Sequence, residues 1–244
     1  LHPVASVWSE YSPLHKRNNL AIENGVYDKP FTDLSKALMA NKMDFHYGDE
    51  IIMQNHARVE DGKLVIGQHS YSTVVVPPSL TLRSSTVKLL KEFAQAAGAG
   101  RLIFMRPLPE RIDGNKADIE LPAGVQTADS VEQVISILDG YYADRIKVTD
   151  KLTGDNAHKI ICHQRMSDEG TWLLFANTDE KREIQTSISL PAQTGTKPVI
   201  LDLMSGEVFD LPAAFNSGRI EFDVKFYPAG SLLVMLPDTQ IDAK

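Results

Sequence analysis

Acidic side chains flank a short aromatic run near residue 45, and their type and spacing suit hydrolytic chemistry. Asp44 precedes residues 45–47, and Asp49 and Glu50 follow them. Two carboxylates held across a cleft serve as acid and base, or as acid and nucleophile, in glycoside hydrolysis. An aspartate directly before an apolar pair has a structural alternative, because it caps a helix and its charge stabilises the helix N-terminus. We favour the cap for Asp49, keep Asp44, Asp49 and Glu50 as a candidate ligand pocket, and designate no catalytic residue.

Three aromatic side chains are candidates for carbohydrate binding, namely Trp8, Tyr47 and Trp172. Aromatic rings present large flat apolar faces of the kind that stack on sugar rings. Trp172 has a second interpretation, because Leu174 lies two residues further along the same expected strand and would point to the same face of the sheet. A core position is therefore favoured for Trp172, and the sugar-binding alternative stays open.

The apolar run at residues 74–76 leads into a turn where a catalytic nucleophile could be placed. A cysteine or serine nucleophile in such a turn requires a sharp strand-to-helix bend, which glycines make accessible. The turn here holds Pro77, Pro78 and Ser79, without a cysteine and without that glycine pattern. The sequence therefore predicts no active nucleophile in this turn. Cys162 lies in an apolar strand-like segment, and we interpret it as a buried, unreactive core residue.

The remaining motifs predict neither a metal site nor a cofactor. The seven histidines include no pair at the i, i+4 spacing of a helical zinc site and no His-Glu-x-x-His motif. Gly98 and Gly100 follow an expected helix, whereas a dinucleotide-binding glycine motif precedes one. We interpret these glycines as a helix stop.

The elements that must position these residues change in character near residue 150. Before it, apolar runs alternate with helical segments such as the one that begins near Ser84, and Asp61-Gly62 lies between two short strands, as in a hairpin. This order predicts an α/β domain, residues 1–150, with a doubly wound and mostly parallel sheet. Seven short strand-like runs follow, and they predict a small all-β sandwich domain, residues 151–244.

Composition excludes several kinds of partner. The 244 residues carry 25 basic and 32 acidic side chains, a net charge of −7, so they are poorly suited to bind a phosphate backbone. No apolar run approaches the ~20 residues that span a bilayer. We therefore expect neither nucleic acid nor a membrane as a partner. The chain begins at Leu1 without a signal-peptide pattern, which indicates a processed protein or part of a longer one.

Several segments together resemble a domain of large bacterial glycoside hydrolases. They are residues 4–8 (VASVW), 44–50 (DFHYGDE), 61–67 (DGKLVIG) and 74–78 (VVVPP), with Tyr71. They look most like the sheet-and-helix domain that follows the catalytic barrel in the α-L-rhamnosidase type. That domain is similar to class I glutamine amidotransferases, without their cysteine, and to the trimerisation domain of family 42 β-galactosidases. The second half resembles the β-domain that follows it, through Arg165 and residues 172–177, 202–207 and 228–236.

The resemblance implies a parent enzyme that degrades polysaccharides in the periplasm or outside the cell. Its catalytic carboxylates would belong to a barrel upstream of Leu1, so this chain alone is expected to be inactive. The first hypothesis is an accessory, non-catalytic C-terminal part that supports the catalytic barrel or a subunit contact in a homo-oligomer. The second is a carbohydrate-binding module that stacks an oligo- or polysaccharide on exposed aromatics. The third is a self-standing hydrolase that uses Asp44, Asp49 or Glu50.

Overall fold

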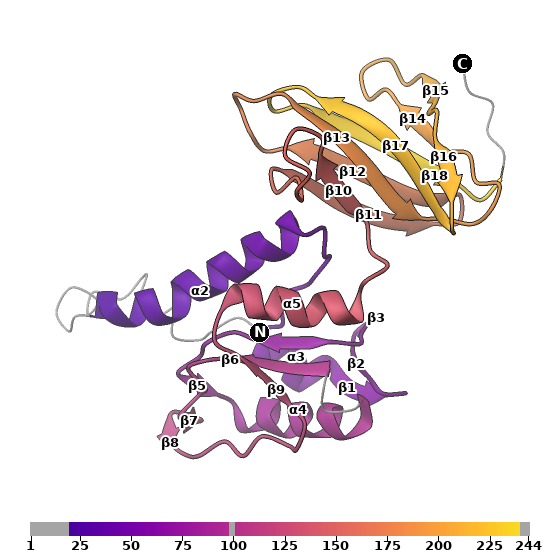
Figure 1. The fold of residues 1–244 in the computed structure, drawn as a ribbon. Coiled ribbons are helices and arrows are strands. Elements are labelled where there is room, and N and C mark those ends of the chain that lie inside the picture. The colour runs from indigo at the N-terminus through magenta and orange to yellow at the C-terminus, as the bar shows by residue number, and fades with distance from the viewer. Residues whose placement is uncertain (1–19, 98–100, 240–244) are drawn as a thin grey trace. The chain divides into compact units, whose positions relative to one another are not determined.

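The computed structural model describes residues 20–97 and 101–239, and in this part the chain forms two compact units (Figure 1). Of the described residues, the first unit holds 20–36 and 46–138, and the second unit holds 37–45 and 139–239. Along the chain, a short segment of the second unit therefore lies between two segments of the first unit, and the rest of the second unit follows. None of the described helices is both long enough and apolar enough to cross a membrane.

The first unit combines helices with three small sheets. The helices are α3 (Glu50–His56), α4 (Ser84–Ala97), α2 (Leu20–Ala40) and α5 (Val131–Tyr141), and the last residues of α2 and of α5 belong to the second unit. One sheet is antiparallel, with β1 (Ala57–Glu60), β2 (Lys63–Ile66) and β3 (His69–Tyr71). A second is parallel, in the order β4 (Val74–Val76), β6 (Leu102–Met105) and β9 (Gln126–Ala128). The third contains β5 (Thr81–Leu82), β7 (Arg111–Ile112) and β8 (Asn115–Lys116).

Local sequence signals account for several of these elements. The hairpin predicted at Asp61-Gly62 is confirmed: both residues have positive φ, 48° and 71°, as a two-residue hairpin turn of the primed type requires. The helix expected from Ser84 is confirmed as α4. Its apolar face, which includes Phe93 and Leu90, packs in one core with the buried side chains of β4 and β6.

The prediction of a doubly wound, mostly parallel sheet of the flavodoxin or class I amidotransferase type is wrong. Parallel pairing among the described residues is confined to β4, β6 and β9, each of three or four residues, and to the two-residue pair β5–β7. Residues 44–47, which precede α3, form no strand. Residues 147–150, which ended the predicted α/β domain, pair antiparallel in a sheet of the second unit. These residues, strand β10 (Lys147–Asp150), pair antiparallel with β13 (Ile184–Pro191) because their buried side chain Val148 packs in the core of the second unit, with side chains of both of that unit's sheets.

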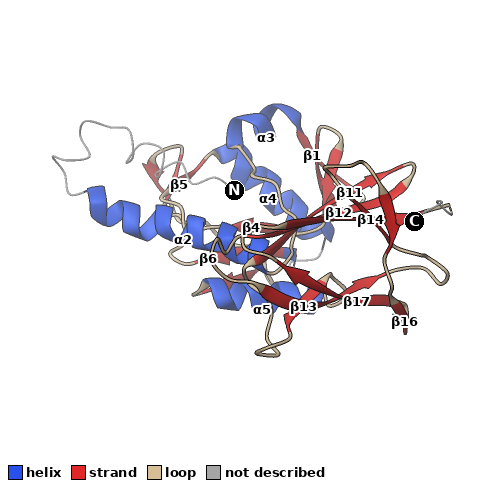
Figure 2. Ribbon diagram, turned by 90° about the horizontal axis from the view of Figure 1, so that it is seen from above, coloured by secondary structure: helices blue, strands red, loops and turns tan. Residues whose placement is uncertain are grey.

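The second unit consists of two antiparallel sheets. The four-stranded sheet runs β10 (Lys147–Asp150), β13 (Ile184–Pro191), β17 (Arg219–Phe226) and β16 (Ala214–Asn216). The five-stranded sheet runs β11 (Ile160–Ser167), β12 (Gly170–Asn177), β18 (Ser231–Pro237), β14 (Val199–Leu201) and β15 (Val208–Asp210). Figure 2 shows β13, β16 and β17 in one layer and β11, β12 and β14 in another.

One core joins the two sheets of the second unit. Buried side chains from both sheets belong to it, among them Ile188 and Phe222 from the four-stranded sheet and Leu173, Phe175 and Val234 from the five-stranded sheet. Alternation along each strand places these side chains on the inner face, since successive residues of a strand point to opposite faces. Trp172 and Leu174, which alternate with Leu173 and Phe175 along β12, therefore lie on the outer face of the five-stranded sheet.

Candidate functional site

Asp49 is a helix cap. Its Oδ1 accepts hydrogen bonds from the backbone N–H groups of Ile51 at 2.8 Å and Ile52 at 2.9 Å, and its own backbone is extended, as expected directly before α3. Both bonds satisfy donors that the first turn of a helix cannot pair internally. The interpretation of Asp49 as a helix cap is therefore confirmed.

Glu50 is buried, with 5% of its surface exposed, and it connects two helices. Its Oε1 accepts a hydrogen bond of 2.8 Å from the backbone N–H of Arg83. Arg83 occupies the N-cap position of α4, because its carbonyl accepts the N–H of Val87. Among the described residues, Oε2 of Glu50 is buried without a hydrogen-bond partner. The carboxylate therefore stabilises the positive end of α4 from a different helix.

Asp44 has a third and separate environment. It is exposed in the segment that belongs to the second unit, and its Oδ1 lies 4.0 Å from Nδ1 of His163. Asp49 and Glu50 belong to the first unit. The structure therefore gives each of the three carboxylates its own partner, and neither unit brings all three together as the facing acid and base that glycoside hydrolysis uses.

The turn after β4 holds no exposed nucleophile. Ser79 is buried, and its hydroxyl donates to the carbonyl of Pro77 at 3.0 Å. The first turn of α4 is also occupied, since Asp113 accepts the backbone N–H of Ser84 at 3.1 Å in addition to the bond from Arg83 to Glu50. Hydrogen bonds from Ser84 lower the pKa of the Asp113 carboxyl. Glu50 and Asp113 thus occupy backbone N–H groups at the start of α4 that would otherwise be available to bind an anion.

The aromatic candidates fall in different parts of the chain. Trp8 lies outside the described residues. Tyr47, 58% exposed, is in the first unit, and its ring centroid lies 5.3 Å from that of Phe31. Trp172 is half-buried in the second unit, where its indole N–H donates to Oγ of Ser167 at 3.0 Å. Tyr47 and Trp172 therefore do not share one sheet or one unit.

Sequence reasoning missed an aromatic cluster next to Tyr47. Nδ1 of His46 lies 2.7 Å from the hydroxyl of Tyr71, and the ring centroids of His46 and His69 are 5.0 Å apart. Burial raises the pKa of the Tyr71 hydroxyl. The three residues come from the segment before α3 and from β3, so no local spacing signal could have predicted their contact. Among the described residues, no group of three or more His, Cys, Asp or Glu side chains could hold a metal ion.

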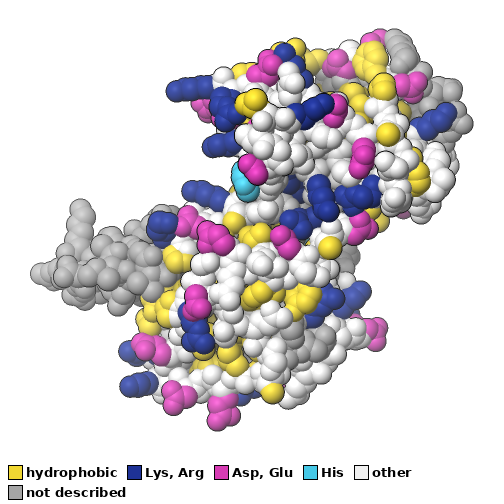
Figure 3. Space-filling view, in the orientation of Figure 1, with side chains coloured by type: hydrophobic (Ala, Val, Ile, Leu, Met, Phe, Trp, Pro, Cys, Tyr) yellow, Lys and Arg dark blue, Asp and Glu magenta, His cyan; other side chains and the backbone are white. Residues whose placement is uncertain are grey.

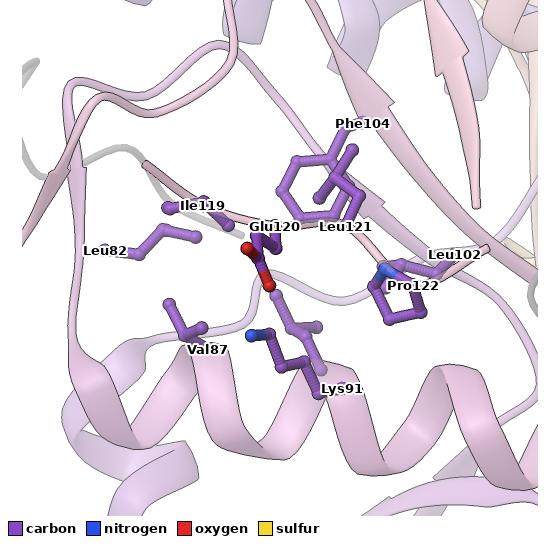
Figure 4. A pocket seen from close by; sticks show the side chains of 10 residues that line it. Leu82, Val87, Lys91, Leu102, Phe104, Ile119, Glu120, Leu121 and Pro122 are labelled. Carbon is purple, nitrogen blue, oxygen red and sulfur yellow. The ribbon is translucent and has the colours of Figure 1, made fainter. Parts of the chain in front are cut away.

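A hollow in the first unit contains none of the candidate residues. It is partly open to solvent, and its lining is mostly apolar, with Leu82, Phe104 and Leu121 among the lining side chains. Lys91 and Glu120 are its charged residues, and Figure 4 shows their charged ends turned toward one another. With one carboxylate in its lining, this hollow lacks a pair for hydrolysis. On the face seen in Figure 3, basic and acidic side chains are interspersed.

Comparisons with known proteins show similarity in fold. No family model matches the chain, and no curated protein matches it. The rhamnosidase from Novosphingobium sp. PP1Y is similar over 84% of this chain and 21% of its own, with 11% identity and a TM-score of 0.60. The exo-carrageenase GH42 from Bacteroides ovatus, solved without ligand, is similar over 86% of this chain and 26% of its own, with 11% identity and a TM-score of 0.53. The chain thus spans about a fifth to a quarter of these enzymes and shares a fold found in glycoside hydrolase chains.

Proposed function

We propose that this chain is an accessory, non-catalytic part of a larger glycoside hydrolase, and that it supports the catalytic domain or a subunit contact. The observation that carries the proposal is the similarity in fold over more than four-fifths of this chain to about a fifth to a quarter of two carbohydrate-degrading enzymes. Most of each enzyme lies outside the similar region, which leaves room for the catalytic machinery elsewhere. A periplasmic or extracellular location belongs to the same proposal.

The environments of Asp49 and Glu50 support a non-catalytic role for this chain. Asp49 caps α3, and Glu50 binds the backbone at the start of α4. A catalytic acid and base must instead face the scissile bond from two sides of a cleft. Here both side chains stabilise helix termini, which is a structural task.

The purified chain is therefore expected to show no glycosidase activity. Aryl glycosides of several sugars, together with carrageenan and rhamnose-containing oligosaccharides, provide the assay. Asp49→Asn and Glu50→Gln should leave the rate at the level of the buffer blank. Turnover by the wild-type chain that either substitution abolishes would contradict the proposal and favour the self-standing hydrolase.

A second measurement separates an accessory role from mere inactivity. In the longer protein that the proposal requires, deletion of this segment is expected to lower the melting temperature of the remainder or to reduce its oligomeric state. An enzyme with unchanged stability, assembly and activity after the deletion would count against the accessory role.

A second candidate function, carbohydrate binding, is favoured by the position of Trp172. The indole lies on the outer face of the five-stranded sheet, its N–H is held by Ser167, and Arg165 is its neighbour across the strand pair. A fixed ring beside a guanidinium group is suited to stack on a sugar and to bind its hydroxyls.

Replacement of Trp172 by alanine should then weaken the affinity of the chain for an immobilised polysaccharide by roughly tenfold, which is the change in affinity expected from the loss of one aromatic contact. Affinity electrophoresis of Trp172→Ala in gels containing carrageenan or a rhamnose-containing polysaccharide provides the measurement. Tyr142→Ala serves as the matched control, because Tyr142 is an exposed aromatic outside the proposed surface. Equal mobility of wild type and Trp172→Ala would remove this candidate.

A further inference from the structure

The outer face of the five-stranded sheet carries a continuous apolar surface. It begins at Trp172 and Leu174 on β12, and the strand register extends it through β18 and β14 to β15. We call this surface the outer patch, and it consists of Trp172, Leu174, Leu233, Met235, Val199, Leu201 and Val208. None of these side chains belongs to the core between the two sheets. Val199 and Met235 are buried, whereas the other five retain exposed surface, up to 38% for Leu174.

The central strand of this sheet has the sequence of a strand that is covered on both faces. In β18 the run from Leu232 to Leu236 contains no polar residue, whereas a strand with one solvated face alternates apolar and polar side chains. Its inner face packs in the core through Val234 and Leu236. A large apolar surface on the opposite face of a sheet marks a site of association. The outer patch therefore calls for a partner beyond the other sheet of this unit.

Two opposite charges flank the outer patch. Arg165 lies beside Trp172 on β11, at one edge of the sheet, and Asp210 lies beside Val199 on β15, at the other edge. Both are exposed, and within the described part of the chain the side chain of neither forms an ion pair or a hydrogen bond. The remaining titratable side chain at the outer positions of these strands, His163, already has Asp44 at 4.0 Å.

The arrangement of the outer face is complementary to itself. Successive register pairs form one row of side chains across the sheet: Arg165, Trp172, Met235, Val199 and Asp210. The strand order is β11-β12-β18-β14-β15, so β18 is the middle strand. A twofold axis along β18, in the plane of contact, exchanges β11 with β15 and β12 with β14. Arg165 of one copy then faces Asp210 of the second copy, and the same contact forms again at the other end of the row.

We propose that the outer patch is a dimer interface, in which two copies of this chain stack their five-stranded sheets face to face about a twofold axis along β18. The apolar side chains provide the contact, with Leu174 against Leu201 of the second copy, and the two Arg165–Asp210 pairs fix the orientation. Stacked sheets lie about 10 Å apart and cross at about 30°, an offset at the sheet edges that the long arginine side chain spans. The inference deepens the subunit contact named in the proposed function and rests on it.

Self-association of the 244-residue chain tests the interface directly. Sedimentation velocity from about 1 µM to about 200 µM should show a reversible equilibrium between monomer and dimer. Leu174→Glu should abolish the dimer in this range, because symmetry places two carboxylates in the contact without partners. Leu152→Glu is the matched control, since Leu152 is 84% exposed in the turn between β10 and β11, and it should leave the dimer unchanged. A monomeric wild type, or equal effects of the two substitutions, would overturn the proposal.

A charge exchange tests the orientation of the two copies. Arg165→Asp and Asp210→Arg should each raise the dissociation constant of the dimer by about tenfold, because each places like charges together at both ends of the row. The double variant restores opposite charges across the axis and should return the dissociation constant to within about threefold of the wild type. Additive losses in the double variant would refute this arrangement. Near-ultraviolet circular dichroism verifies that each variant is folded.

A cross-link locates the axis. Leu233 lies on β18, so in the dimer it lies close to Leu233 of the second copy, and Leu233→Cys should be joined to itself by a short bis-maleimide reagent. Leu152→Cys, outside the outer patch, should give little dimer under the same conditions. The native Cys162 does not compete, because it packs against the core and burial raises the pKa of its thiol to about 12. Equal cross-linking of both variants would place the axis elsewhere and contradict the proposal.

The same experiments separate the dimer from carbohydrate binding, which uses Trp172 on the same face. A chain that stays monomeric while Trp172→Ala loses its affinity for polysaccharide would assign the face to sugar and overturn the dimer. The accessory role is tested independently, through the melting temperature of the longer protein after deletion of this segment. A monomeric chain whose deletion still destabilises the longer protein would thus refute the dimer alone.

Discussion

Gly170→Ala is expected to lower the free energy of unfolding by more than about 3 kcal/mol, because it combines backbone strain with a steric clash. Gly170 has φ of 139°, a conformation that L residues rarely adopt. A Cβ atom there would lie 2.2 Å from the carbonyl oxygen of Leu236 and 2.9 Å from Cα of Pro237. Both atoms are backbone of β18, which pairs with β12 at this position. No side-chain rotation can relieve the contact, so the two strands would have to separate.

Gly218→Ala is the matched control for this substitution. Gly218 also has positive φ, 78°, but no atom lies within 4 Å of the position its Cβ would take. It should cost only the strain of the left-handed backbone, about 1–2 kcal/mol. Urea unfolding followed by near-ultraviolet circular dichroism measures both variants. Equal losses would show that the approach of β12 to β18 is looser than the distances indicate.

Phe175→Ala is expected to cost about 3–5 kcal/mol, through loss of buried apolar surface and the cavity left behind. The ring is fully buried between the two sheets of the second unit, and its centroid lies 6.4 Å from that of Phe226. Neighbours from two sheets, each held by its own hydrogen bonds, cannot collapse into the space. The same unfolding measurement therefore should show a large loss.

Phe215→Ala provides the matched comparison. Phe215 is 41% exposed on β16, a short strand at the edge of the four-stranded sheet. Its truncation removes less buried surface and leaves no enclosed cavity, so a loss below about 1 kcal/mol is expected. A cost for Phe215→Ala similar to that of Phe175→Ala would argue that the core does not lie between the sheets.

Features determined by neighbouring residues were open to prediction from the sequence. The turn at Asp61-Gly62, the start of α4 at Ser84 and the capping preference of Asp49 all depend on backbone conformation and on bonds that span a few residues. The Pro77-Pro78-Ser79 turn does not suit a catalytic nucleophile, and this too depends only on neighbouring residues, since the Ser79 hydroxyl donates to the carbonyl of Pro77. Each follows from dihedral preferences or from a side chain that reaches its own backbone.

The tertiary structure alone decided which faces meet. Residues 147–150 have the pattern of a strand, but only the burial of whole sheet faces selects β13 as their antiparallel partner. For the same reason the sequence could not show that Glu50 binds the N–H of Arg83, 33 residues away, or that Lys42 binds Asn156, 114 residues away. Such contacts form because packing brings distant backbone segments together and then requires each buried polar group to find a partner. The sequence by itself thus determined the cap at Asp49 and the turn at Asp61-Gly62, because these depend on neighbouring residues, while long-range packing decided the pairing of the sheets and the partners of Glu50 and Asp44.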